Sequence, residues 1–352
     1  MTTTTAIEFT GPRQRANDRT IGHWLLVCAA MVLAMIVIGG ITRLTESGLS
    51  IVYWRPVTGF LPPLTDAAWA AAFELYRTSP QYLEVNAGMT MAEFRAIFWW
   101  EYIHRAWGRL IGLVFFLPFV WFLIRGRVRR SLLPRLVILF LLGGAQGVLG
   151  WYMVQSGLVD VPAVSQYRLA AHLSLAFLIY GALVWTGLSL IYPDGMAVAD
   201  RMGLRVRRLA LVVLGLIAMT ILSGAFVAGT DAGLTFNTFP LMEGGLLPPG
   251  YFGHAAAAFE DHGTVQFHHR ALALVSLVAV AILWWQSRWL ALTPRARRVA
   301  NALMVMALLQ VALGITTLLL VVPLHAAASH QAGAVLLFTL TLWLLHELRL
   351  PA

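Results

Sequence analysis

The chain of 352 residues is 59% hydrophobic and 12% charged, which is too apolar for a soluble fold, where about a quarter of residues are charged. The net charge of +9 rests on arginines clustered between apolar runs, a pattern that indicates membrane topology and argues against nucleic acid as a partner. The one cysteine, Cys28, excludes an intramolecular disulfide and a covalent haem attached through C-x-x-C-H.

Eight apolar runs are long enough to cross a bilayer as helices, for which about 20 residues are needed. None of them alternates like the strands of a membrane β-barrel, so backbone hydrogen bonding in lipid favours helices. The runs cover residues 22–41, 97–124, 135–154, 169–192, 208–229, 266–287, 299–322 and 327–346. The predicted fold is an all-α integral membrane protein with eight transmembrane helices.

Arginine sets the predicted orientation of these helices. It gathers in the N-terminal arm and in the loops after the second, fourth and sixth runs, whereas the loop between the fifth and sixth runs has no arginine and carries four acidic residues. The positive-inside rule therefore predicts that both termini are cytoplasmic. Because no apolar signal segment precedes residue 21, we expect an uncleaved multi-pass protein of a bacterial inner (plasma) membrane.

The first outer loop, residues 42–96, is long enough to fold by itself. Residues 66–77 (DAAWAAAFELYR) predict a short helix that ends before Ser79 and Pro80. Thr90 and Glu93 form a capping-box pattern at the start of the second long helix. Two interpretations stay open at this point: ordinary surface helices, or a lid over a site at the outer face.

The two halves of the chain resemble each other, which predicts two pseudo-repeated four-helix bundles. The matching segments are TESGLS at 45–50 with TDAGLT at 230–235, EYIHRA at 101–106 with QFHHRA at 266–271, and QGVLG at 146–150 with QVALG at 310–314. The predicted organisation is an arm (1–21), a first half (22–192), a cytoplasmic linker (193–207), a second half (208–346) and a tail (347–352).

Four histidines, His104, His172, His269 and His330, lie on the even-numbered helices. Each sits a few residues inside the outer end, roughly 5–15 Å below the surface at 1.5 Å per residue. Two opposed imidazoles at one depth are what a six-coordinate haem iron needs. The pattern therefore predicts two haem sites, one between His104 and His172 and one between His269 and His330.

Other interpretations of these histidines are an interhelical hydrogen bond, a zinc site or a proton relay. The repetition at matched positions favours haem. His268 adjoins His269 but points about 100° away, so only one of them faces the bundle. His254, His262 and His325 fall in outer loops, where they could contact haem propionates or simply be solvated, and His346 is expected at the cytoplasmic interface.

Three further residues near the predicted ligands carry charge. Arg105 and Arg270 each follow a ligand and could pair with a haem propionate, or they could snorkel to the interface. Glu101 lies one helical turn before His104, whereas the second half has Gln266 at the matching position. A carboxyl group beside one porphyrin only could exchange a proton there, and Glu101 is the candidate catalytic residue. A structural partner for Arg105 is the alternative.

Across nearly the whole chain, the sequence resembles the haem A synthase family. The resemblance rests on GGITRLTESGLS with the following double proline, on EYIHR, on the helix of His172, on QFHHR, and on HQAG at 330–333. It implies the same four axial histidines, Glu101 as the catalytic carboxylate, and oxidation of the C8 methyl of haem O to the formyl group of haem A through successive hydroxylations and loss of water. Haem O or haem A would occupy the first half, and a permanent haem b the second.

In one respect the chain departs from that family, because many bacterial members carry a cysteine pair in outer loops and this chain has none there. It therefore resembles the cysteine-poor proteobacterial and mitochondrial enzymes. Expected partners are the lipid bilayer, haem O synthase, cytochrome oxidase assembly factors and a second copy of the chain. The competing classes are a di-haem b-type, quinol-oxidising electron-transfer protein and a transporter.

Overall fold

The computed structural model describes residues 11–53, 59–159, 162–194, 201–251 and 256–349. Eight long helices dominate it: α1 (Pro12–Leu44), α4 (Met91–Ile124), α5 (Leu133–Gln155), α6 (Gln166–Ile191), α7 (Arg201–Gly229), α9 (His262–Ser287), α10 (Pro294–Leu319) and α11 (Leu324–Glu347). The short helices α2 (Asp66–Arg77), α3 (Pro80–Glu84) and α8 (Ala257–Glu260) and the 3-10 turn η1 (Ala232–Leu234) lie between them. Among the described residues, no strand forms.

All eight long helices are apolar enough to cross a membrane, so the predicted multi-pass all-α membrane fold is confirmed. Several of them continue beyond the predicted apolar runs. The first helix begins at Pro12, where proline suits the first helical position, and Gln14 donates a hydrogen bond to Asp18 one turn later. The predicted capping box is present at the start of α4, where Thr90 and Glu93 bond reciprocally.

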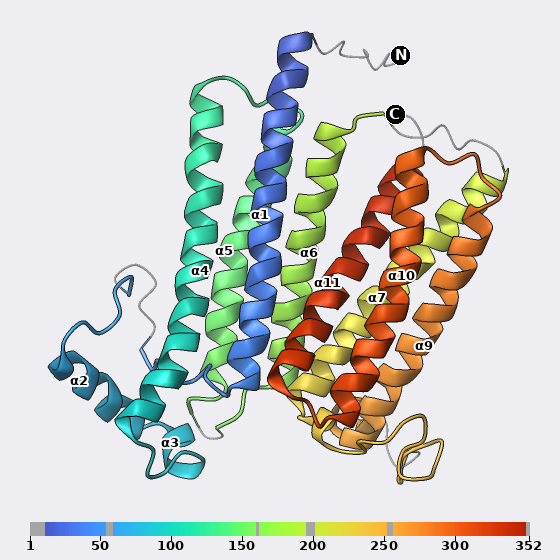
Figure 1. Cartoon of the computed structure of the whole chain (residues 1–352). Coiled ribbons are helices and arrows are strands. Elements are labelled where there is room, and N and C mark those ends of the chain that lie inside the picture. Colours follow the sequence, from blue (N-terminus) through green and yellow to red (C-terminus); the bar gives the residue numbers. More distant parts are fainter. Residues whose placement is uncertain (1–10, 54–58, 160–161, 195–200, 252–255, 350–352) are drawn as a thin grey trace.

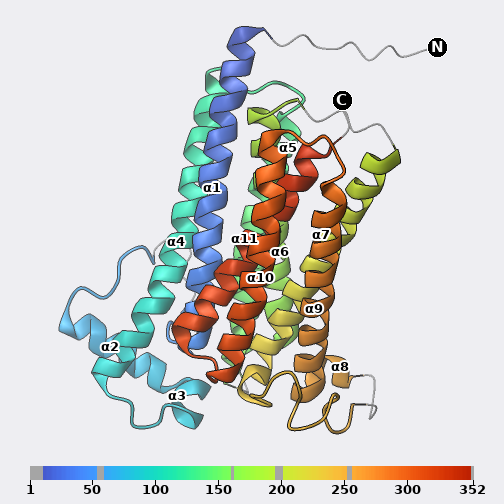
Figure 2. The ribbon, with the colours of Figure 1, turned by 45° about the vertical axis from the view of Figure 1, so that its right-hand side comes forward.

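The helices form two groups that follow each other in sequence. Figure 1 shows α1, α4, α5 and α6 on one side and α7, α9, α10 and α11 on the other, and Figure 2 shows the same bundle turned by 45°. The start of α1 and the end of α11 lie at one end of the molecule, while α2 and α3 lie at the opposite end. This arrangement supports the prediction of two four-helix halves.

Four helices, α1, α6, α7 and α11, make the contacts between the halves. Buried apolar side chains of all four belong to one continuous core cluster. Polar contacts cross this core too: Tyr180 and Thr339 share a hydrogen bond of 2.6 Å between their hydroxyl oxygens. The Gln331 amide of α11 donates to the Ile36 carbonyl of α1 at 2.9 Å.

The long segment between α1 and α4 folds into a cap, here defined as residues 59–90, at the start of α4. Its predicted helix at 66–77 is present as α2, and α3 follows at Pro80. Trp69 and Tyr76 of the cap form an aromatic cluster with Phe94 and Phe98 of α4. Gln81 ties it to the bundle by donating to the Glu46 carbonyl oxygen at 2.8 Å.

At the opposite end of the molecule, His346 is not at the surface as expected but is 1% exposed. Its ring packs edge-on against Trp185, and Arg349 covers it while donating to the Tyr192 carbonyl oxygen. Glu347 beside it accepts two hydrogen bonds from Arg295. These contacts fix the end of α11 against α6 and α10. The apolar pattern of the sequence does not predict them.

Candidate functional site

The four predicted ligand histidines lie on four different helices, and each half-buried ring rests on a glycine of the preceding long helix. A Cβ atom added at that glycine would lie 2.8–3.1 Å from the histidine Cε1, so a larger residue would displace the ring. The pairs are Gly39 with His104, Gly150 with His172, Gly224 with His269, and Gly314 with His330.

These four rings also share one orientation. In every pair Cε1 is nearest to the glycine, Nδ1 is next and Nε2 is farthest. Histidines that each formed a separate hydrogen bond between helices would not be expected to repeat the same glycine contact and the same ring orientation. The fourfold repetition supports one common task for all four side chains.

In the second half the two imidazoles face each other across the bundle. The ring centroids of His269 and His330 are 6.4 Å apart, and their planes are perpendicular, at 85°. Metal–imidazole bonds of about 2 Å on both sides of one iron place two ring centroids roughly 6 Å apart. The spacing therefore fits two axial ligands of one haem. In the first half, His172 lies close enough to His104 for an electrostatic interaction.

Polar side chains orient the rings. Ser223 shares a hydrogen bond of 2.9 Å with His269 Nδ1, and Thr42 lies 3.4 Å from His104 Nδ1. Gln146 and Gln310 bridge in the same way to the Nδ1 and the backbone carbonyl of His172 and His330. A hydroxyl can accept from Nδ1–H at His104 and His269, which leaves Nε2 for a metal, the usual division of an imidazole ligand. The Gln146 and Gln310 amide nitrogens are donors, and Gln146 lies 3.3 Å from both ring nitrogens of His172, so these two contacts position the rings without assigning the ligating nitrogen.

Glu101 is 3% exposed and fully engaged. Its Oε2 accepts from the Ser50 hydroxyl and the Ile51 backbone N–H, both at 2.7 Å. Its Oε1 accepts from the Arg105 guanidinium at 2.5 Å. Three donors, one of them cationic, hold the carboxyl group of Glu101 in this buried place.

Gln266 has the same position in the second half, with a neutral side chain. Its Nε2 donates to the carbonyl oxygens of Ala232 and Thr235, and its Oε1 accepts from Arg270 at 2.7 Å. Both arginines then reach the loop that follows the first helix of their half. Arg105 donates to the Ile51 and Tyr53 carbonyl oxygens, and Arg270 donates to the matching carbonyls of Phe236 and Thr238. The two halves therefore share this arrangement of a buried side chain, an arginine and loop carbonyl groups. They differ in the charge of the buried side chain, which is Glu101 in the first half and Gln266 in the second.

The other histidines show no such arrangement. His262 and His325 are exposed, His268 bonds to the Tyr251 hydroxyl at 3.1 Å, and His254 lies outside the described residues. Across the part of the chain that the structure describes, no three His, Cys, Asp or Glu side chains gather as a zinc site would require. Two opposed imidazoles suit haem instead, because the porphyrin supplies the other four ligands.

Sequence reasoning identified the histidines but not the residues that support them. Gly150, Gly314, Gln146 and Gln310 were visible only as the repeated motifs QGVLG and QVALG, which ordinary helix packing also explains. The signal that could have found them is the fixed spacing: each glutamine precedes its glycine by four residues, one helical turn. Glutamine and glycine therefore share the helix face turned to the histidine.

The chain is similar to known proteins over nearly its whole length. Residues 22–342 match the model of the COX15-CtaA family, described as cytochrome oxidase assembly protein. A protein named heme A synthase from Nitrosospira multiformis is 51% identical over 338 residues, which cover 95% of each chain. One from Paramagnetospirillum magneticum is 49% identical over 94% of each chain. Heme A synthase COX15 of Bos taurus is 45% identical over 95% of this chain and 83% of its own. The chain is therefore a member of the COX15-CtaA family of cytochrome oxidase assembly proteins.

Proposed function

We propose that this protein is a haem A synthase, an oxidoreductase of the membrane that converts haem O to haem A for cytochrome oxidase. The observation that carries the proposal is the set of four glycine-backed histidines, of which His269 and His330 stand 6.4 Å apart. Membership of a family whose relatives are named heme A synthase supports it. Those relatives give no support to the quinol-oxidising alternative.

In this proposal the two halves have different tasks. His104 and His172 bind the substrate haem O and the product haem A, while His269 and His330 hold a permanent haem b. When bound, haem b supplies one-electron transfer chemistry. The asymmetry between Glu101 and Gln266 supports this division, because only the first half places a carboxylate one turn from an axial ligand.

Glu101 is the proposed catalytic residue. Oxidation of the C8 methyl group to a formyl group develops positive charge on a carbon conjugated to the ring, and a fixed carboxylate stabilises that charge or accepts the proton. The donors from Ser50, Ile51 and Arg105 hold the carboxylate in place before the reaction begins. Arg105 and Arg270 remain the candidate contacts for haem propionates, in addition to their bonds to the outer loops.

A Glu101→Gln substitution tests the catalytic role, and the second half supplies its structural precedent. Gln266 keeps the arginine contact without a charge, and its amide donates to loop carbonyls where Glu101 accepts from loop donors. Glutamine at 101 should therefore keep the bond to Arg105 and leave both haems bound. We expect haem A to fall at least about 100-fold, the usual weight of such a group. The measurement is acid–acetone extraction and chromatography of pigments from purified protein co-expressed with haem O synthase.

Gln266→Glu is the matched control, because it changes the same position in the half that we assign to haem b. It should leave haem A production within a few-fold of the wild type. A Glu101→Gln protein that makes haem A normally would exclude Glu101 as the catalytic group. Wild-type protein that holds haem B alone, and converts no haem O, would contradict the synthase proposal itself.

The remaining assignments are proposals of the same kind. The arginine-rich end faces the cytoplasm of a bacterium in this proposal, with the haem sites near the outer face of its inner membrane. The arm, linker and tail at 1–21, 193–207 and 347–352 are cytoplasmic segments, although residues 1–10, 195–200 and 350–352 lie outside the described part. Haem O synthase and oxidase assembly factors are the proposed partners for delivery and collection of haem, and a homo-oligomer is a further proposed state.

A further inference from the structure

A groove between α9 and α10 has no part in the proposed reaction. It lies at the end of the molecule opposite the cap and has a volume of about 530 Å³. Six residues line it: Trp284, Arg288, Arg297, Asn301, Met304 and Val305. The groove is open along the outside of the bundle, where a membrane-spanning pair of helices meets lipid.

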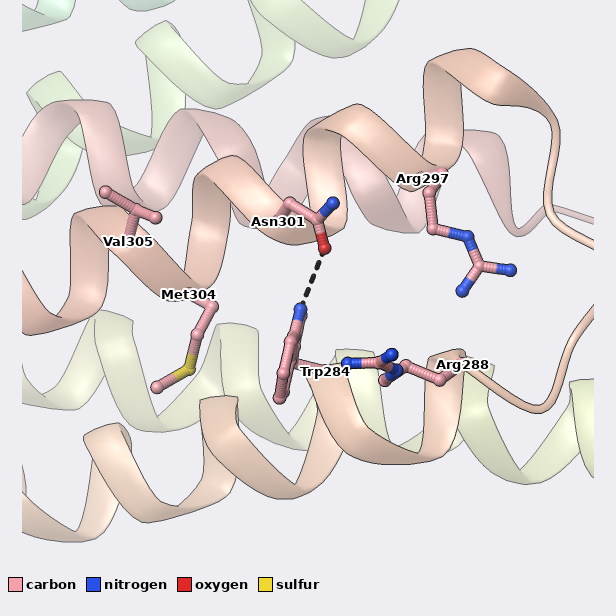
Figure 3. A pocket seen from close by; sticks show the side chains of 6 residues that line it. All are labelled: Trp284, Arg288, Arg297, Asn301, Met304 and Val305. Carbon is pink, nitrogen blue, oxygen red and sulfur yellow. Dashed lines mark hydrogen bonds between the residues drawn. The ribbon is translucent and has the colours of Figure 1, made fainter.

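Its two ends differ in chemistry. Figure 3 shows Arg288 and Arg297 beside the α9–α10 connection and Met304 and Val305 at the other end. Between them the Trp284 indole N–H donates to the Asn301 side-chain oxygen at 2.9 Å. From Arg297 to Val305 the helix rises about 12 Å at 1.5 Å per residue. The polar end therefore lies at the membrane boundary and the apolar end about two turns deeper.

The charge of the polar end is not compensated within the described part of the chain. Arg297 donates one bond, to the Leu290 carbonyl at 2.9 Å, and Arg288 stacks over the Trp284 ring at 5.1 Å. Neither forms an ion pair with a carboxylate there, whereas their neighbour Arg295 is paired with Glu347. Most of the N–H donors of both guanidinium groups are therefore available to an anion.

We propose that this groove binds one anionic phospholipid, with its phosphate between Arg288 and Arg297 and an acyl chain along Met304 and Val305. Arginine suits phosphate because its fork of N–H donors matches the oxygens, and a tryptophan one turn deeper is typical of the headgroup level. Basic pockets between transmembrane helices bind such headgroups. A free phosphate would use the arginines alone and would have no need of the apolar end.

The test is lipid retention by the full chain, measured by native mass spectrometry after delipidation and addition of phosphatidylglycerol or phosphatidylcholine. We expect the wild type to retain phosphatidylglycerol preferentially. One arginine near an anionic surface increases the affinity for an anionic lipid roughly fivefold. The double variant Arg288→Gln with Arg297→Gln should therefore lower the preference for phosphatidylglycerol over phosphatidylcholine about 30-fold. Arg127→Gln is the matched control, since Arg127 stacks on Trp121 at 4.4 Å but lines no part of the groove.

A second variant keeps the test valid if the double variant folds poorly. Val305 is 65% exposed, so Val305→Trp should be tolerated while it obstructs the apolar end and lowers lipid retention with both arginines intact. Equal retention by wild type, Val305→Trp and the arginine variant would overturn the proposal. Displacement of the lipid by inorganic phosphate alone, with Val305→Trp unaffected, would also overturn it in favour of a free-anion site.

Discussion

At the scale of single residues, the chemistry depends on small side chains as much as on the histidines. Each of the four proposed ligand rings lies against a glycine, where an added Cβ would come within 2.8–3.1 Å of the ring, so a larger residue would displace the imidazole. The sequence indicates these histidines because intramembrane ionisable groups are rare and these recur at matched positions, and their role as haem ligands stays a prediction. Their supporting glycines and glutamines could not, since such residues are common wherever membrane helices pack closely.

Substitution of these glycines separates the two proposed haem sites. Gly224→Ala should push His269 aside and lower the haem b content several-fold, while Gly39→Ala should act through His104 on haem O and haem A. Gly215→Ala is the control on the same helix as Gly224, because no atom lies within 4 Å of the added carbon. Chromatography of the extracted haems measures each outcome. Loss of the same haem from both variants would show that the halves are wrongly assigned.

At the scale of helices, the apolar runs predicted all eight spans but not all their ends. The length of an apolar run shows how much of a helix lies in lipid, but the helix itself can continue through polar residues. Helix α7, for example, begins at Arg201, seven residues before the predicted run at 208–229. In contrast, α10 stops at Leu319, three residues before the predicted end, because Val321 and Val322 adopt left-handed φ values of 58° and 56°. Such values are unusual for β-branched residues, so no sequence rule predicts that turn.

The cap over α4 should be sensitive to alkaline pH through Tyr76. This phenol is fully buried, donates to Gln81 and accepts from Asn86, and burial raises its pKa above the ordinary value of 10.0. The folded cap therefore keeps the neutral phenol, and its stability is complete below pH 10.0 and declines as the pH rises further. Limited proteolysis of residues 59–89 across this range measures the effect. Tyr76→Phe should remove the additional loss at high pH, and an unchanged pH profile in that variant would refute the role of Tyr76.

At the scale of the whole molecule, the halves are joined by contacts that no repeat in the sequence encodes. Arg43 of the first half binds both carboxylate oxygens of Asp231 in the second, but both side chains are partly exposed, so this pair contributes little to stability. Deeper in the bundle, Gln331 lies against Gly40, where an added Cβ would come within 1.6 Å of its Oε1. Gln331 replaces the apolar Leu173 of the first half, so its position could be found only from the assembled fold.

The junction between Gly40 and Gln331 can be tested by a rescue experiment. Gly40→Ala should expel Gln331 and break its bond to Ile36, at a cost of about 1–3 kcal/mol in the free energy of unfolding. Gln331→Ala added to Gly40→Ala should recover part of that loss, because the obstructing amide is gone. Thermal unfolding in detergent compares the variants, with Asp231→Asn as a nearly neutral reference. Strictly additive losses would mean that the two residues do not interact.

Gly39 and Gly40 are consecutive residues of α1, and each faces a different ligand helix. Gly39 backs His104, while Gly40 receives Gln331, the direct neighbour of His330. This short stretch of the α1 backbone therefore contacts residues of both proposed haem sites. A movement of α1 that makes room for a porphyrin in one site would also move the backbone that supports the other site. If both proposed haem sites are filled, their occupancies would be thermodynamically linked, and such linkage is reciprocal. A haem b already bound in the second half would fix the position of α1 beside the first site before haem O binds. The enzyme would then take up its two haems in a set order.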